Sequence, residues 1–335
     1  MQELRKERLD RGVKVRSESI YAISSLKEIM FIIGPGLLLA ALLLILPLFV
    51  SSYWQGALKI TGVYVLLAIG FGFLANYVGL VSLGGALFVG VGGYLSGGLN
   101  YFFDLPMIVT IPIAAVGGAL ICTILLLPAL PLRGVYFAIV TLVYPMALSR
   151  IIVATGAFRG TDGLPGLERF PVGIGPIYLI FIVILICLYL LSRLVNYEDF
   201  GLVLRGVKDN ELSIKASALH LTWYKIQAVF IAAFMGCFAG AYLTHLYGWV
   251  GTSLLAQDFS ILPVAAAVVG GPGTIFGPLV GAFILVPISE AMRDYGTLRI
   301  VFYAIILVIF VVFWTEGILD YLKRKYEQFE HWVEM

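Results

Sequence analysis

Three polar side chains, Asn76, Ser82 and Thr141, lie inside or beside long apolar runs, where they could bind a solute. Lipid offers no hydrogen-bond partners, so each side chain must find a partner within the protein. Hydrogen bonds between helices would satisfy these groups without any further role. Lining a polar pathway would also satisfy them, and there they could hold the carboxylate or ammonium group of a zwitterion. The residues alone leave both interpretations open.

Residues that catalyse reactions or bind metals are scarce. The three histidines, His220, His245 and His331, are not spaced with cysteines or carboxylates as metal ligands are. The three cysteines lie singly in apolar runs, and no stretch fits the phosphate-binding pattern Gly-x-x-x-x-Gly-Lys-Ser/Thr. We therefore predict no catalytic activity, no metal and no cofactor, and expect any energy for uphill movement of a solute to come from elsewhere.

The elements that position these residues are membrane helices. Of 335 residues, 61% are hydrophobic and 13% are charged, and the mean hydropathy is +0.99. A chain of this composition has too few polar residues to cover the core of a soluble protein. The net charge of +2 creates no strong field that would attract nucleic acid. The predicted fold class is an all-α polytopic membrane protein in contact with lipid.

Apolar runs of about 20 residues can cross a bilayer as helices. Seven runs qualify, the last with its flanks: 31–50, 60–78, 108–128, 135–154, 174–194, 226–247 and 300–314. Residues 83–99 are glycine-rich, and residues 259–292 contain a Gly/Pro turn that predicts two short helices, 259–269 and 277–288. With the short helices we expect about ten membrane segments. The predicted break contains Gly270, Gly271, Gly273, Gly277 and Pro278.

Lys and Arg predict the orientation, because they gather on the cytoplasmic side of membrane proteins. They are frequent in residues 1–29, 196–224 and 319–335, and absent from 51–58, 100–106 and 248–257. We therefore predict a cytoplasmic leader (1–29), a membrane domain (30–318) and a cytoplasmic tail (319–335), with both termini in the cytoplasm.

The segment 196–224 is the large cytoplasmic segment within the predicted membrane domain. Asp209 or Asn210 could cap a helix whose first turn contains Glu211, and the apolar residues that follow fall on one face. Such a helix could be a connector on the bilayer surface, or it could dock a cytosolic partner. The candidate docking residues are Arg205, Lys208, Asp209, Glu211, Ala216, Ala218 and Leu219.

Four motifs occur in order along the chain. They are Asn-Tyr-Val-Gly-Leu-Val-Ser-Leu-Gly at 76–84, Arg-Gly-Val-Tyr-Phe-Ala-Ile-Val-Thr-Leu at 133–142, Gly-Thr-Asp-Gly-Leu-Pro-Gly at 160–166 and Gly-Gly-Pro-Gly-Thr-Ile-Phe-Gly-Pro at 270–278. Over residues 60–314 the chain thereby resembles permease subunits, of the LivM type, of the ATP-binding-cassette importers for branched-chain amino acids.

The resemblance implies an arrangement like that of the cobalamin importers and transport by alternating access in a prokaryotic cell membrane. It implies four kinds of partner: a homologous second permease, two cytosolic ATPases, an extracytoplasmic binding protein and membrane lipid. It also favours the docking role for residues 208–221. The implied substrate pathway contains Asn76, Ser82, Gly84, Gly85 and Thr141.

Two sites of the resemblance leave alternatives open. The family often has His or Gln where Gly85 stands, so the solute could be a small amino acid or an amide. In the external loop, Thr161, Asp162 and Gly163 could simply form a turn, or they could lie under a binding protein.

Two other classes of transport protein are possible. An ion-coupled secondary transporter would need charged residues within its spans. A passive channel or permease for urea or short amides would tolerate an uncharged interior, but it gives the cytoplasmic helix no role.

Overall fold

The computed structural model describes residues 41–132, 134–196, 198–211, 214, 219–271, 273–292, 295, 296, 301, 305, 308 and 317. The chain forms two compact units, residues 1–48 and 49–335. Residues 41–48 of the first unit are helical. The elements described below belong to the second unit.

Helix α3 is the central element of this unit. It spans Ser52–Phe73, continues as a π-helical turn, η1 (Leu74–Val78), and ends at Gly79, whose φ is 75°. Its residues are apolar around most of the helix, so it is buried by helices on several sides rather than along one stripe. The helices packed on α3 are α7 (Gly175–Asn196), α10 (Leu221–Tyr247), α11 (Asp258–Gly270) and α12 (Gly277–Ala291).

Glycines allow α10 and the glycine-rich helix α4 (Gly85–Phe103) to touch through their backbones. A Cβ atom on Gly92 would lie 2.2 Å from the Cys237 carbonyl oxygen, and one on Gly240 would lie 2.1 Å from that of Val89. Small residues have this role where membrane helices cross closely. Helix α5 (Met107–Leu126), followed by the 3₁₀ turn η2 (Leu127–Ala129), packs against both α4 and α10.

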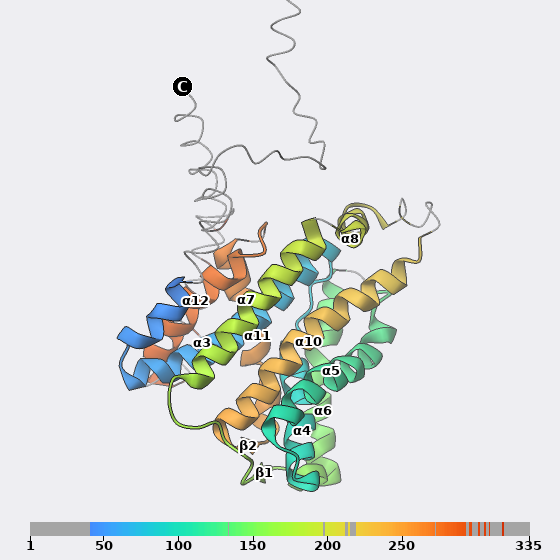
Figure 1. Ribbon diagram of the computed structural model, residues 1–335. Helices are drawn as coiled ribbons and strands as arrows, with labels where there is room; N and C mark the ends of the chain where they lie inside the picture. Colours follow the sequence, from blue (N-terminus) through green and yellow to red (C-terminus); the bar gives the residue numbers. More distant parts are fainter. Residues whose placement is uncertain are drawn as a thin grey trace, which may run out of the picture. The chain divides into compact units, whose positions relative to one another are not determined.

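The two ends of this bundle carry different elements (Figure 1). One end, here called the β end, has two short antiparallel strands, β1 (Leu164–Pro165) and β2 (Trp249–Val250). The opposite end, the α8 end, has helix α8 (Asp199–Asp209). The remaining elements are α6 (Val135–Thr155) and the 3₁₀ turns η3 (Ala157–Arg159) and η4 (Thr252–Leu255).

Helices α11 and α12 form a tight antiparallel hairpin. Gly270 and Gly277 meet so closely that a Cβ atom on Gly270 would lie 1.7 Å from the Gly277 carbonyl oxygen. The two predicted short helices are therefore confirmed, with the break between Gly270 and Gly277. In Figure 1, α3, α11 and α12 lie together on one side of α10, and α4, α5 and α6 lie on the other.

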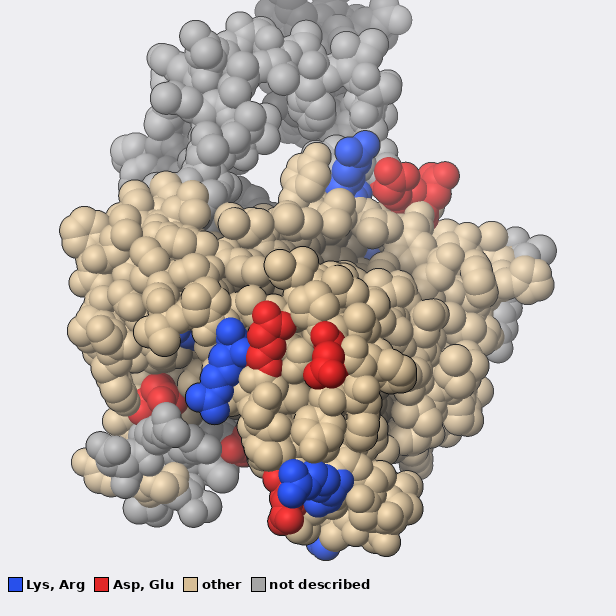
Figure 2. All heavy atoms as spheres, turned by 60° about the horizontal axis from the view of Figure 1, so that its bottom comes forward, with Lys and Arg blue, Asp and Glu red and all other residues tan. Residues whose placement is uncertain are grey.

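The described residues contain five helices long and apolar enough to cross a membrane. The chain is thus a largely helical, multi-pass membrane protein. Few charged side chains interrupt the face shown in Figure 2. A total of about ten segments and the cobalamin-importer-like arrangement stay predictions. The five helices lie at Ser52–Val78, Met107–Ala129, Val135–Thr155, Gly175–Asn196 and Leu221–Tyr247.

Some predicted boundaries are wrong. The span predicted for residues 60–78 begins earlier, at Ser52, so most of the segment 51–58 is helical. Helix α4 likewise extends beyond the glycine-rich segment 83–99 to Phe103, into the segment 100–106. Both segments lack Lys and Arg, which indicates a side of the membrane but does not define where a helix ends. The leader 1–29 and the tail 319–335 lie outside the described residues, as do most of 31–50 and 300–314.

Candidate solute pathway and docking segment

The chain between α3 and α4 is held by hydroxyl groups that accept backbone hydrogen bonds. The Leu83 N–H donates to Thr141 Oγ1 (2.9 Å), and the Gly84 N–H donates to Ser82 Oγ (3.3 Å). The Ala86 N–H donates to Ser260 Oγ of α11 (3.0 Å). These bonds satisfy donors at the start of α4, where a helix leaves its first N–H groups without internal partners. They support the structural interpretation of Ser82 and Thr141.

Gly85 stands where a side chain does not fit. A Cβ atom there would lie 2.2 Å from the Phe259 carbonyl oxygen, closer than real atoms approach. The start of α4 therefore packs directly on the start of α11. A His or Gln at this position would require a different local backbone.

Two of the five predicted pathway residues line a small hollow, here called the Ser82 hollow. It measures about 20 Å³ and is bounded by Ser82 and Gly85, by α3 and by the start of α11. Gly84 and Thr141 adjoin it through the hydrogen bonds described above. Asn76 lies in η1 and is not among its lining residues.

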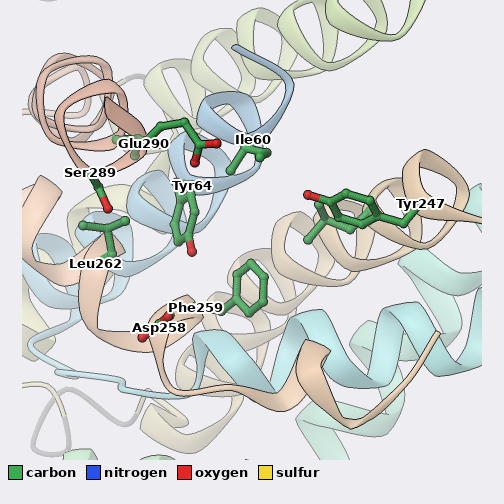
Figure 3. Close-up of a pocket in the computed structure, with 10 residues that line it drawn as sticks. Ile60, Tyr64, Tyr247, Asp258, Phe259, Leu262, Ser289 and Glu290 are labelled. Carbon is green, nitrogen blue, oxygen red and sulfur yellow. The ribbon is translucent and has the colours of Figure 1, made fainter. Parts of the chain in front are cut away.

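A larger cavity of about 160 Å³, the Tyr64 cavity, lies between α3, α10, α11 and α12 (Figure 3). The rings of Tyr64 and Phe259 stack with their centroids 5.5 Å apart and their planes at 19°. Figure 3 shows Tyr64 between α12, which carries Glu290, and the start of α11, which carries Asp258. The lining residues are Ile60, Tyr64, Leu243, Tyr247, Asp258, Phe259, Leu262, Val286, Ser289 and Glu290.

The Tyr64 cavity combines apolar walls, aromatic rings and two carboxylates. Aromatic faces and carboxylates attract cations, while the aliphatic side chains suit an alkyl group. The cavity therefore suits a small solute with an ammonium group and an apolar part. The sequence analysis selected none of these lining residues. The sequence feature that could have indicated this cavity is Asp258, a carboxylate at the start of a short apolar helix.

The predicted external loop is attached to the rest of the β end. The Trp249 indole N–H donates to the Asp162 carbonyl oxygen (3.1 Å). Gly163 has a φ of 70°, and a Cβ atom there would lie 2.2 Å from the Val250 carbonyl oxygen. This geometry supports the turn interpretation. Thr161 and Asp162 are nevertheless exposed, so a role in meeting another protein stays a prediction.

A buried cluster of polar side chains connects elements at the β end of the bundle. The sequence analysis did not predict it. His245 Nε2 lies 2.9 Å from the hydroxyls of both Ser96 and Thr110, and its Nδ1 lies 2.7 Å from the Glu168 carbonyl oxygen. The cluster joins α4, α5 and α10 to the segment before α7. Within the described residues, no group of three or more His, Cys, Asp or Glu side chains is arranged to hold a metal ion.

The predicted docking helix needs a correction. Lys208 and Asp209 do not begin a helix, because they are the last residues of α8, which the sequence analysis did not expect. Asn210 is extended (φ −157°, ψ 99°), and its carbonyl accepts a hydrogen bond from the Ile214 N–H (3.4 Å). Glu211 and Ile214, which follow Asn210, are helical, in agreement with the Asn210 alternative. Ala216 and Ala218 lie outside the described residues.

Glu211 forms an ion pair inside the protein. Its Oε1 lies 2.5 Å from Lys225 Nζ, and the two side chains are only 16% and 4% exposed. Arg205 donates to the Val195 carbonyl oxygen (2.8 Å). Lys208 and Asp209 are exposed and remain candidates for contact with another protein, and Leu219 is 37% exposed.

Helix α8 lies directly against the π-helical end of α3. A Cβ atom on Gly79 would lie 3.5 Å from the Lys208 Cα atom. A hollow of about 280 Å³, the Lys208 cavity, opens between residues 78–80 and 207–211. The docking segment therefore meets the part of the chain that leads on to Ser82 and Gly85.

A bundle of apolar helices with an inner cavity and an amphipathic helix at one end is typical of a multi-pass membrane protein of the transport class. The family described as "Branched-chain amino acid transport system / permease component" matches residues 54–314, and the chain belongs to this family. The family consists of transport permeases rather than enzymes.

Three relatives support this assignment. The chain is 26% identical to the LivM high-affinity branched-chain amino acid permease protein of Salmonella typhimurium, over 84% of this chain and 74% of the relative. It is 25% identical to the Escherichia coli LivM protein, over 88% and 76%. It is 23% identical to a probable LivM protein of Methanocaldococcus jannaschii, over 72% and 80%. No solved structure matches the chain.

Proposed function

We propose that this chain is one permease subunit of an ATP-binding-cassette importer that moves branched-chain or related small hydrophobic amino acids into the cytoplasm. In this proposal the β end faces the outside of a prokaryotic cell membrane and the α8 end and both termini face the cytoplasm. The names of the relatives and the order of the four motifs support it. The walls of the Tyr64 cavity suit both the ammonium group and the alkyl side chain of such a substrate.

The contact between α8 and the end of α3 is the observation that carries this proposal. A partner that pushes on α8 also pushes on η1 and Gly79, and the chain continues from there to Ser82 and Gly85. A π-helical turn departs from regular helix geometry and is often found at functional sites. Movement of α8 could thereby open and close the region around the Ser82 hollow, as alternating access requires.

The partners in this proposal occupy different parts of the molecule. Two cytosolic ATPases would supply the energy, and one of them would contact Lys208 and Asp209. A binding protein would meet the exposed Thr161 and Asp162 at the β end. A homologous second permease would complete the membrane part in a cobalamin-importer-like arrangement.

Co-purification with the ATPases tests the proposal. The chain is expressed with its neighbouring permease and ATPase subunits, and Asp209→Lys is compared with Asp162→Lys, an exposed aspartate at the other end. Glu211 is left unchanged because it pairs with Lys225. We expect the ATPases to be lost from Asp209→Lys and retained by wild type and Asp162→Lys. An ATPase that never associates with the wild-type chain contradicts the proposal and favours a channel for urea or short amides.

A second candidate, the ion-coupled transporter, is favoured by one observation. Asp258 and Glu290 line a cavity within the bundle, and carboxylates at such places can relay protons or ions. Uptake of labelled leucine into vesicles separates the two candidates. ATP-driven uptake that is insensitive to collapse of the proton gradient supports the importer, and gradient-driven uptake without ATP supports the ion-coupled transporter.

A further inference from the structure

Three of the hollows in the described part of the chain follow one face of α3 and its π-helical continuation, η1. Ile60 and Tyr64 line the Tyr64 cavity, and Val78 lines the Lys208 cavity. Between them, Leu67, Phe71 and Leu74 line the Ser82 hollow. These six residues are spaced by three or four positions, which places them on one side of a helix. From Ile60 to Val78 they cover about 27 Å at 1.5 Å per residue, which is close to the thickness of a bilayer core.

The middle hollow is the narrowest of the three. Its volume of about 20 Å³ compares with about 160 Å³ and 280 Å³ for its neighbours. A space of roughly 10–15 Å³ is the least that holds one water molecule, so the Ser82 hollow holds little more than that. The structure is therefore closed to an amino acid between the Tyr64 cavity and the Lys208 cavity.

Phe259 lies at the boundary between the first two hollows. Among the described residues, it alone lines both the Tyr64 cavity and the Ser82 hollow. Its ring stacks on Tyr64 and its backbone carbonyl lies against Gly85, so it is fixed from both sides. The side chain is half-buried and lies in the Tyr64 cavity beside Tyr64 (Figure 3).

We infer that the solute moves along this face of α3 and that Phe259 is the gate between the Tyr64 cavity and the Ser82 hollow. The inference rests on the proposed transport function, because it names the path through the same protein. The gate position also explains why Gly85 lacks a side chain: the start of α11 must approach α4 closely to place Phe259 there. A preference for amino acids with apolar over polar side chains follows from an aromatic gate that offers no hydrogen-bonding group.

Cysteine accessibility tests this gate. In the assembled complex, Cys122, Cys187 and Cys237 are replaced by Ala, and single cysteines are introduced as Ser289→Cys in the Tyr64 cavity or Ser82→Cys in the Ser82 hollow. A charged, membrane-impermeant methanethiosulfonate reagent is added to intact cells without substrate. We expect Ser289→Cys to react and Ser82→Cys to be protected.

Removal of the ring is then expected to expose the inner position. Phe259→Ala should raise the labelling rate of Ser82→Cys at least tenfold, and the smaller change Phe259→Leu should give an intermediate rate. The matched control is Phe283→Ala on α12, because Phe283 also makes an aromatic contact, 5.9 Å from Phe181, but lines none of the three hollows. Each purified variant complex is first checked to elute like the wild-type complex. If Phe259→Ala does not assemble, the comparison is made with Phe259→Leu alone.

Two results would overturn the inference: unchanged protection of Ser82→Cys in both Phe259 variants, or equal exposure in Phe283→Ala. Labelling is independent of the ATPases and of the substrate's identity, so the importer proposal can fail while the gate stands. Labelling of Ser289→Cys only in inside-out vesicles would refute the proposed orientation, and the Phe259 variants are then compared from that side.

Discussion

The buried ion pair between Lys225 and Glu211 allows a quantitative prediction about stability. The Nζ and Oε1 atoms are 2.5 Å apart, and the side chains are 4% and 16% exposed. Removal of one partner from such a shielded pair leaves an uncompensated charge, which costs about 3–5 kcal/mol. Replacement of both partners by uncharged side chains removes that penalty and is often close to neutral. At about 2 °C per kcal/mol, each single substitution should lower Tm by roughly 6–10 °C.

Thermal unfolding of the purified complex in detergent measures this effect. The variants are Glu211→Gln, Lys225→Met and the double substitution, and the control is Glu198→Gln, which changes an exposed carboxylate directly before α8. We expect both single variants to lose several degrees, the double variant to recover most of the loss, and the control to stay within about 1 °C because exposed substitutions change stability little.

The reasoning fails if the single variants unfold within 1 °C of wild type, or if the losses in the double variant simply add. Either outcome would mean that Lys225 and Glu211 do not stabilise each other. The expected outcome would explain why charge reversal at Glu211 is unsuitable as a test of docking: it would place two cations together inside the fold.

Two further predictions concern close packing and hydrogen bonding. Gly85→Ala should cost about 1–3 kcal/mol by overpacking against the α11 backbone, whereas Gly56→Ala, which has nothing within 4 Å, should keep or raise Tm; equal Tm values would contradict this. Thr141→Val removes the acceptor of the Leu83 N–H and should cost about 1–3 kcal/mol and reduce uptake. Thr61→Val, whose hydroxyl bonds only within its own helix, should change both quantities little, and matching losses in the two variants would refute the assigned role.

Elements that depend only on the residues of one segment were predicted well from the sequence. Hydropathy located α5, α6 and α7 to within a few residues, because a bilayer requires a minimum length of apolar helix. Glycine and proline located the break between α11 and α12, because they interrupt a helix wherever it lies. The resemblance to the permease family, confirmed by the family match, rests on motifs that are similarly local.

The candidate site was only partly predicted, because its residues are far apart in the chain. Ser82 was selected for its motif, but Asp258 and Glu290 meet Tyr64 only through the packing of α3, α11 and α12. Likewise, the hydrogen-bond partners of His245 come from two other helices and a loop. The pattern of residues within one segment cannot reveal such contacts, because they depend on how the helices pack.

Gly79 lies between α8, where an ATPase is proposed to act, and the predicted solute pathway. A φ of 75° strains residues that carry a Cβ atom, and a Cβ atom at this position would lie 3.5 Å from the Lys208 Cα atom, so α8 packs directly against Gly79. The π-helical turn before Gly79 and the hydroxyl-held segment after it are both departures from regular helix, so they can rearrange without breaking the long helices around them. If α8 is pushed, the displacement should therefore concentrate between η1 and Ser82, in the segment that leads to Gly85 and its contact with Phe259. A rigid connection at this point would instead have to shift α3 as a whole against four packed helices.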